Sequence, residues 1–178
     1  MSTLDTCGVC GFRRDLVTLH EVPERLRAAT ASFVNVINDA GTNAALRPSP
    51  ERWSVLEYGA HARDVLIAIR ERLITASIVD EPVGAPIYRD ERVSLGFYGL
   101  DTPFEVANDL DAMADLFLRT LLALPSGFEN RALIYSPITP EKVTIRWLGA
   151  QALHECEHHL GDARDNLTLL AGRSLPSN

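Results

Sequence analysis

Apolar residues recur at helical spacing in four stretches of the chain. Within residues 23–39 they form one face made of Leu26, Ala29, Phe33, Val36 and Ile37. Side chains three and four positions apart lie on the same side of an α-helix, so this pattern predicts a helix. Gly41 follows, and a glycine shortly after the last apolar position is typical of a helix end.

The second and third stretches begin with helix-capping signals. Ser54 and Glu57 match a capping box, in which each residue's side chain satisfies a free backbone N–H group of the other. Thr102 and Glu105 repeat the pattern, with Pro103 at the first helical position. The apolar positions that follow are Val65, Leu66, Ile69 and Leu73 in the second stretch and Val106, Leu110, Met113, Phe117 and Leu121 in the third.

A fourth helix is predicted from about Ile145 to Leu170, before Gly172. The connections between the four helices are residues 42–53, 79–101 and 126–143. The second is rich in proline, glycine and aromatic residues and is long for a structureless loop, so we expect it to cover part of the fold. The third is expected to hold a short extended pair around residues 132–135. The pattern predicts an all-α four-helix bundle with a long loop between helices two and three. The second and third connections are both long enough to permit a crossover.

The length of 178 residues suits one domain with a hydrophobic core. We expect an N-terminal segment with a Cys-x-x-Cys motif at 1–20, the bundle at 21–174 and a tail at 175–178.

The amino-acid composition indicates which binding partners and which cellular location to expect for the protein. A net charge of −7 and a pI near 5.2 argue against nucleic-acid binding, which needs a basic surface. No apolar run approaches the ~20 residues of a membrane span, so no membrane interaction is expected. Three cysteines are not the even set of a secreted disulfide framework. A cytoplasmic protein with a small-molecule substrate is the simplest interpretation.

His61, on the second helix, has candidate partners far along the chain on the fourth. Imidazole and carboxylate groups are good ligands for Zn²⁺, Ni²⁺ or Fe²⁺. The fourth helix offers two pairs at i,i+4 spacing, His154 with His158 and Glu155 with His159. One helix cannot point both pairs inward equally well, so the helical register must decide between them.

The register favours Glu155 and His159. At about 100° per residue with His159 at zero, the apolar residues of the fourth helix lie between about −20° and +80°. Glu155 lies at the edge of this arc, at about −40°, whereas His158 at about −100° and His154 at about −140° are predicted to point away from the core. His61 lies at the edge of its own apolar stripe. The predicted ligands are therefore His61, Glu155 and His159, and three protein ligands leave the open position typical of a catalytic metal site.

Asp64 and Asp162 each follow one of these histidines by three residues. That spacing lets a carboxylate accept a hydrogen bond from an imidazole N–H and orient the ring, so we expect this role for both. Spacing alone leaves open that all five residues are polar side chains with no metal.

Cys7 and Cys10 resemble half of a zinc knuckle, with Gly11 after the second cysteine. Three interpretations stay open: a metal site completed by Cys156, His20 or a second subunit, a redox-active pair, or two thiols without a role. Cys156 lies on the core face of its helix and is expected to be a small apolar filler.

The second connection carries Tyr88, Arg89, Arg92 and Tyr98. These side chains are candidates for recognising a carboxylate above the metal, and the alternative is a solvated loop whose aromatic residues pack on the bundle. Trp53 and Trp147 stand near helix starts and are expected to be core anchors rather than site residues.

Taken together, the motifs resemble the DinB-like superfamily, which includes YfiT-type hydrolases and mycothiol-dependent maleylpyruvate isomerases. The matching segments are Arg47-Pro48, Arg52-Trp53-Ser54-Val55, His61-x-x-Asp64, Val143-Thr-Ile-Arg146-Trp147 and Glu155-x3-His159-x2-Asp162. Their order and spacing extend from the second helix to the fourth.

The resemblance implies a four-helix bundle that binds a divalent metal, most simply zinc, through His61, Glu155 and His159. A Glu-x3-His pair on the last helix is the version that the mycothiol-dependent isomerases use. The resemblance therefore implies a thiol S-transferase that takes a low-molecular-weight thiol such as mycothiol as co-substrate. The alternatives are a metal-dependent hydrolase and a non-enzymatic metal-binding or stress-related bundle. Family members often form homodimers, so a homodimer is a further expectation.

Overall fold

The computed structural model describes residues 4–173. Four long helices dominate it: α1 (Val22–Ala40), α2 (Val55–Ile78), α4 (Pro103–Leu122) and α5 (Ile145–Arg173). The shorter elements are η1 (Arg14–Leu16), η2 (Gly41–Ala45), α3 (Arg89–Ser94), η3 (Phe97–Gly99), η4 (Phe128–Asn130), β1 (Ala132–Ile134) and β2 (Lys142–Thr144). The prediction of an all-α four-helix bundle is confirmed. The tail expected at 175–178 lies outside the described residues.

Both predicted capping boxes are present. The backbone N–H of Glu57 donates to Ser54 Oγ at 3.1 Å, and the N–H of Ser54 donates to the Glu57 carboxylate at 2.7 Å. Thr102 and Glu105 exchange the same bonds at 3.3 and 2.7 Å at the start of α4. Each box satisfies N–H groups that the first turn of a helix leaves free, which fixes where α2 and α4 begin.

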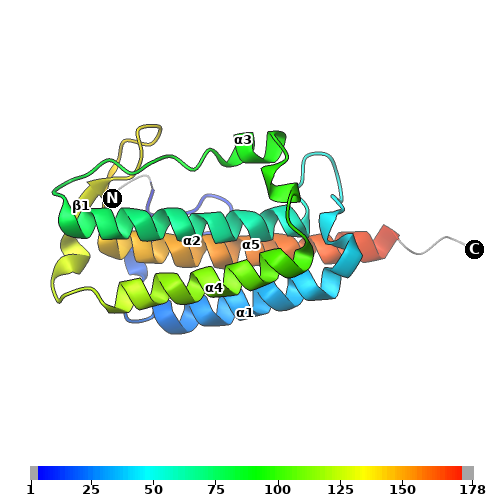
Figure 1. Cartoon of the computed structure of the whole chain (residues 1–178), viewed down its shortest axis with the longest axis horizontal. Helices are drawn as coiled ribbons and strands as arrows, with labels where there is room; N and C mark the ends of the chain where they lie inside the picture. Colours follow the sequence, from blue (N-terminus) through cyan, green and yellow to red (C-terminus); the bar gives the residue numbers. More distant parts are fainter. Residues whose placement is uncertain (1–3, 174–178) are drawn as a thin grey trace, which may run out of the picture.

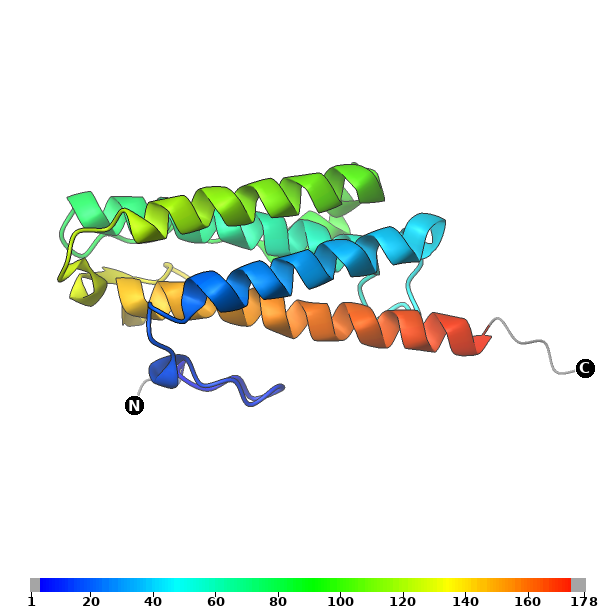
Figure 2. The ribbon, with the colours of Figure 1, turned by 90° about the horizontal axis from the view of Figure 1, so that it is seen from below.

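The four helices form a bundle in which α2 packs on α4 and α5, and α1 packs on the same two helices. Figures 1 and 2 show that α1 and α5 run in one direction and α2 and α4 in the other. Because α2 and α4 are parallel, the chain between them must return along the whole bundle. The expected crossover is therefore the long second connection. Between the helices lies one hydrophobic core that includes Phe33, Ile37, Leu66, Leu110, Phe117 and Leu148.

The crossover (residues 79–102) is more ordered than a loop. Its first part pairs with β1: Gly84 N–H donates to the Ile134 backbone oxygen and Ile134 N–H to that of Pro82, both at 2.9 Å. It then forms α3 and η3 above α2 (Figure 1). The extended pair expected around residues 132–135 is present as β1, which runs antiparallel to β2 with Leu133 opposite Val143.

The N-terminal segment folds as a tight turn against the outside of the bundle. Thr6 and Arg13 form an antiparallel bridge, and η1 packs on α5 (Figure 2). Within residues 4–173, none of the helices combines the length and the apolar character that crossing a membrane requires.

Candidate metal centre

His61 from α2 and Glu155 and His159 from α5 meet between the two helices. Glu155 Oε2 lies 3.3 Å from Nε2 of His61 and 3.3 Å from Nε2 of His159. One nitrogen or oxygen from each residue lies within 4.8 Å of those of the other two. The structure thus brings together the three residues selected by the helical register, and metal binding by them stays a prediction.

Aromatic side chains hold the two imidazole rings. Tyr58 stacks on His159, with ring centroids 5.2 Å apart and an interplanar angle of 23°. Trp53 meets the His61 ring edge-on at 5.3 Å. The expectation that Trp53 is only a core anchor is therefore wrong. Trp147, in contrast, is buried with its ring 5.1 Å from that of Tyr135, as an anchor would be.

The ring of His159 is oriented as expected, since its Nδ1 lies 2.9 Å from Asp162 Oδ2. The ring of His61 is not. Its Nδ1 lies 3.2 Å from the hydroxyl of Tyr98, and Tyr98 is almost completely buried. When both Nδ1–H groups donate to these oxygens, both Nε2 lone pairs face Glu155, which is the arrangement that a metal ion requires.

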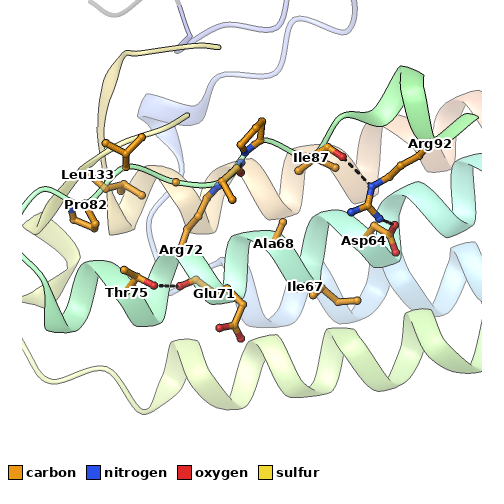
Figure 3. Close-up of a pocket in the computed structure, with 14 residues that line it drawn as sticks. Asp64, Ile67, Ala68, Glu71, Arg72, Thr75, Pro82, Ile87, Arg92 and Leu133 are labelled. Atoms are coloured by element: carbon orange, nitrogen blue, oxygen red, sulfur yellow. Dashed lines mark hydrogen bonds and ion pairs between the residues drawn. The ribbon is translucent and has the colours of Figure 1, made fainter. Parts of the chain in front are cut away.

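The role expected for Asp64 is a wrong prediction. Its carboxylate accepts hydrogen bonds from Arg63 Nε at 3.0 Å and from Arg92 Nη1. Arg92 also donates to the backbone oxygen of Ile87 at 2.8 Å, as Figure 3 shows. Two guanidinium groups thus hold the buried Asp64, and the crossover supplies Tyr98 to His61 in its place.

The negative charge of Glu155 favours a cation between the side chains of His61, Glu155 and His159. Burial raises the pKa of Glu155, but hydrogen bonds from His154, His159 and His61 outweigh it and hold that pKa well below its usual range. Burial lowers the pKa of His159, but Asp162 and Glu155 raise it more, to about 9. In the metal-free protein a proton on His159 thus supplies positive charge beside Glu155. A divalent cation fits the same need, with two imidazole nitrogens and one carboxylate as ligands.

A cavity of about 450 Å³ opens beside His61 and Glu155. Its other lining residues come from α2, the crossover, the β1–β2 connection and α5: Val65, Arg72, Pro86, Ile87, Tyr88, Arg89, Asp90, Glu91, Tyr135, Ser136, Ile138, Thr139 and Gln151. Two of the four candidates for recognising a carboxylate, Tyr88 and Arg89, line this cavity. Tyr88 has left-handed backbone angles (φ 52°, ψ 49°), which are costly for a bulky residue and are found at functional loops. Arg92 and Tyr98 instead hold Asp64 and His61.

Arg72 is a site residue that sequence reasoning missed. Its side chain is buried, with the guanidinium carbon 4.4 Å from the centre of the Tyr135 ring and Nη2 bonded to the Ala85 backbone oxygen. Nε and Nη1 have no hydrogen-bond partner among the described residues. The sequence does contain a sign of this role, because Arg72 is a charged residue on the apolar stripe of α2, three residues after Ile69.

A second cavity, of about 440 Å³, lies on the other side of residues 82–87, between them and α2 (Figure 3). Arg72 and Ile87 line both cavities. Its lining is largely apolar and contains none of the three predicted metal ligands. Of these two cavities, the one beside His61 is therefore the one that reaches the predicted metal ligands.

His154 and His158 face away from the bundle core, as the register predicted, and lie against the N-terminal segment. His154 is buried because the N-terminal segment covers this side of α5, with the Phe12 ring 5.2 Å from that of His154. Arg14 donates to Gln151 Oε1, and its Nη2 lies 2.8 Å from His154 Nδ1. The helical register separates side chains that face the bundle core from those that do not. It cannot predict that another segment packs on the second group from outside.

Neither Cys156 nor His20 lies with the cysteine pair among residues 4–173. Cys156 is fully buried in the core, as a small apolar filler would be, and His20 is exposed. The side chains near Cys7 and Cys10 are instead those of His154 and His158. Partial burial raises the pKa of Cys7, but the backbone N–H groups of Cys10 and Val9 and the side chains of His154 and Cys10 lower it to about 6.

A family model described as the DinB superfamily matches residues 23–163. The solved structure of YfiT from Bacillus subtilis superposes on the chain with a TM-score of 0.76 at 17% sequence identity, covering 86% of this chain and 87% of that one. YfiT is described as a probable metal-dependent hydrolase with an unusual four-helix bundle topology. At this identity the likeness shows the fold alone. No protein of curated function gives a significant match.

Proposed function

The chain belongs to the DinB superfamily, and on that premise we propose that it is a metal-dependent enzyme that acts on a small molecule. One observation carries the proposal: two imidazole nitrogens from different helices lie 3.3 Å from the same carboxylate oxygen, at the wall of an accessible cavity. We propose zinc as the metal, because two nitrogens and one oxygen are a donor set of catalytic zinc sites. Bound there, zinc would act as a Lewis acid and activate a water or a thiol as nucleophile near neutral pH.

Hydrolysis is the reaction we propose first. The support is the shared fold with YfiT, described as a probable metal-dependent hydrolase. Transfer of a low-molecular-weight thiol is the second candidate. It is favoured by the pair that faces His61, which is Glu155 with His159, the glutamate-containing version that the family resemblance links to thiol-dependent members.

The chain's own residues have distinct parts in either reaction. Tyr98 and Asp162 orient the two imidazole rings, and Gln151 donates to Glu155 Oε1 at 2.7 Å and holds the carboxylate. Arg72 and Arg89 place positive charge along the cavity.

We propose that the substrate carries an anionic or carbonyl group bound by Arg72. Buried N–H donors without a partner are costly, and an oxygen-rich ligand would satisfy Nε and Nη1. A cavity of about 450 Å³ suits a molecule of metabolite or drug size.

Metal analysis of protein purified without added metal tests the centre. We expect His61→Ala and His159→Ala each to lose one metal equivalent relative to wild type. His20→Ala is the control, because this histidine is exposed and outside the cluster, and should keep the full content. Unchanged metal in both site variants would refute the assignment.

A turnover screen then separates the reaction classes. Esters and amides of small anionic molecules test hydrolysis, and mycothiol, bacillithiol and glutathione with electrophiles test thiol transfer. We expect Arg72→Met to lower kcat/KM at least tenfold on the anionic substrates. A fully metal-loaded protein that is inert with every combination would count against an enzyme and favour a structural or sensory bundle.

A further inference from the structure

The N-terminal turn brings two thiols to two imidazoles of α5. Cys7, Cys10, His154 and His158 each offer one ligand atom, and all four atoms lie within 4.8 Å of one another. We propose that these four residues bind a structural zinc ion that fastens the N-terminal segment to α5, at a site separate from the centre at His61, Glu155 and His159.

The spacing suits tetrahedral zinc. Zn–S bonds of about 2.3 Å and Zn–N bonds of about 2.0 Å place the ligand atoms of a tetrahedral site about 3.3–3.8 Å apart. The four atoms are thus at most about 1–1.5 Å further apart than in a bound site, a change that side-chain rotation supplies. Two thiolates and two imidazoles fill the coordination sphere, which is typical of a structural rather than a catalytic site.

The backbone of the cysteine turn is ordered and favours the thiolate at Cys7. Gly11 N–H donates to the Cys7 backbone oxygen at 2.9 Å, and Gly11 takes a positive φ of 73° that glycine adopts without strain. Despite burial, the backbone N–H groups of Cys10 and Val9 lower the pKa of Cys7, whereas burial and the neighbouring Cys7 raise the pKa of Cys10. N–H groups directed at sulfur favour the thiolate, the form that binds a metal.

The histidine side of the cluster has an unsatisfied atom. His154 is buried, and its Nε2 has no hydrogen-bond partner among the described residues. Its Nδ1 lies 3.4 Å from Glu155 Oε1. With the proton on Nδ1 and shared with this carboxylate, Nε2 offers its lone pair to the zinc.

Arg14 and Asp162 are two further charged residues next to the two histidines of the cluster. Arg14 Nη2 lies 2.8 Å from His154 Nδ1 and can donate to it only when that nitrogen carries no proton. In the zinc-bound tautomer Arg14 therefore gives up this bond and keeps those to Gln151 and to the Leu4 backbone oxygen. The ring of His158 stacks on that of His154 at 5.2 Å, and its Nε2 lies 3.6 Å from Asp162. A carboxylate thus lies near each histidine, as is usual around zinc-bound imidazoles.

The zinc would act on the fold through the residues it holds in place. With Cys7 and Cys10 tied to α5, Arg14 stays on Gln151, and Gln151 donates to Glu155. Zinc removal should release the segment and expose the Arg13 and Arg14 peptide bonds to trypsin.

Cobalt substitution tests the site directly. The probe is Co²⁺ bound to the full-length His61→Ala protein under reducing conditions, so that the other centre does not contribute. Two thiolate ligands give sulfur-to-cobalt charge-transfer absorption and intense visible bands of tetrahedral cobalt. We expect both in the parent, and we expect Cys7→Ser with Cys10→Ser to abolish both. Cys156→Ala is the matched control and keeps them, because that cysteine lies in the core.

X-ray absorption of zinc in the same His61→Ala protein needs no change in the cluster, so it remains decisive if the cysteine variants fail to fold. The expected shell is two sulfurs at about 2.3 Å and two nitrogens at about 2.0 Å. A shell of nitrogen and oxygen alone would overturn the proposal. So would a reduced, folded protein without charge-transfer bands whose mass falls by two hydrogens on mild oxidation, because Cys7 and Cys10 would then be a redox pair.

Discussion

His154 and Glu155 are neighbours in the chain, yet their side chains belong to two different clusters and meet with Nδ1 and Oε1 3.4 Å apart. The other oxygen of the same carboxylate lies 3.3 Å from both His61 and His159. One glutamate therefore faces the candidate catalytic centre with one oxygen and the cysteine–histidine cluster with the other.

Glu155→Gln should weaken both centres. At His61 and His159 it removes a negatively charged ligand, so we expect metal affinity to fall by more than about 100-fold. At the cysteine cluster it removes the partner of His154, and loss of such a partner costs about 10–100-fold. Competition against a chromophoric chelator measures both affinities. Glu157→Gln is the control, because Glu157 pairs with Arg25 at 2.9 Å. A variant that alters only the first centre would show that the two are not coupled.

Tyr98→Phe tests which residue orients His61. Removing the hydroxyl 3.2 Å from Nδ1 takes away the acceptor of the ring proton, and we expect about a 10–100-fold loss of metal affinity at the candidate catalytic centre. Asp64→Asn should leave that affinity within twofold, because Asp64 is bonded to Arg63 and Arg92 instead. The reverse ranking in the same titration would restore Asp64 to the role that its spacing suggested.

Local rules predicted the parts of this fold that local physics determines. Helix periodicity and capping boxes found all four long helices, since both depend on residues within a few positions of each other. The same periodicity selected Glu155 and His159, because a helical register fixes which face a side chain occupies.

The errors arose where a distant segment packs on a helix. Tyr98 reaches His61 through the crossover, and α2 alone gives no sign of it. The N-terminal turn buries His154 on a side of α5 that the register placed outside the bundle core. The sequence shows Arg72 as a charged residue on an apolar stripe. That its Nε and Nη1 lack hydrogen-bond partners among the described residues depends on how residues 82–87 pass over it.

Gly84→Ala should disturb the wall of the substrate cavity. A Cβ at this position would lie 2.5 Å from the Tyr135 backbone oxygen and 2.7 Å from Arg72 Nε. Backbone on one side and a buried guanidinium on the other must shift, so we expect a loss of about 1–3 kcal/mol in the free energy of unfolding. Urea denaturation compares it with Gly99→Ala, which meets no atom within 4 Å. Equal stability of the two variants would mean that the crossover is free to move away from Arg72.

Glu57→Gln should reveal an acid-sensitive contribution at the start of α2. Burial raises the pKa of Glu57, but Arg47 and the Ser54 backbone N–H outweigh it and lower that pKa below its ordinary value of 4.5. Because the folded pKa is lowered, the carboxylate stabilises the protein above about pH 4.5, and this contribution is lost as pH falls through the folded pKa.

Glutamine keeps a capping side chain and removes only the charge, so the variant should be less stable than wild type by about 0.5–1 kcal/mol at pH 7. The difference should shrink as pH falls below about 4.5 and through the folded pKa, where the carboxyl of the wild type becomes protonated. Urea unfolding of both proteins at pH 7, 5 and 3 measures it, and any release of metal by acid affects both alike. Glu24→Gln, at an exposed carboxylate in the first turn of α1, should show a smaller change with pH. A difference that persists undiminished at pH 3 would assign the effect to side-chain shape rather than to the charge beside Arg47.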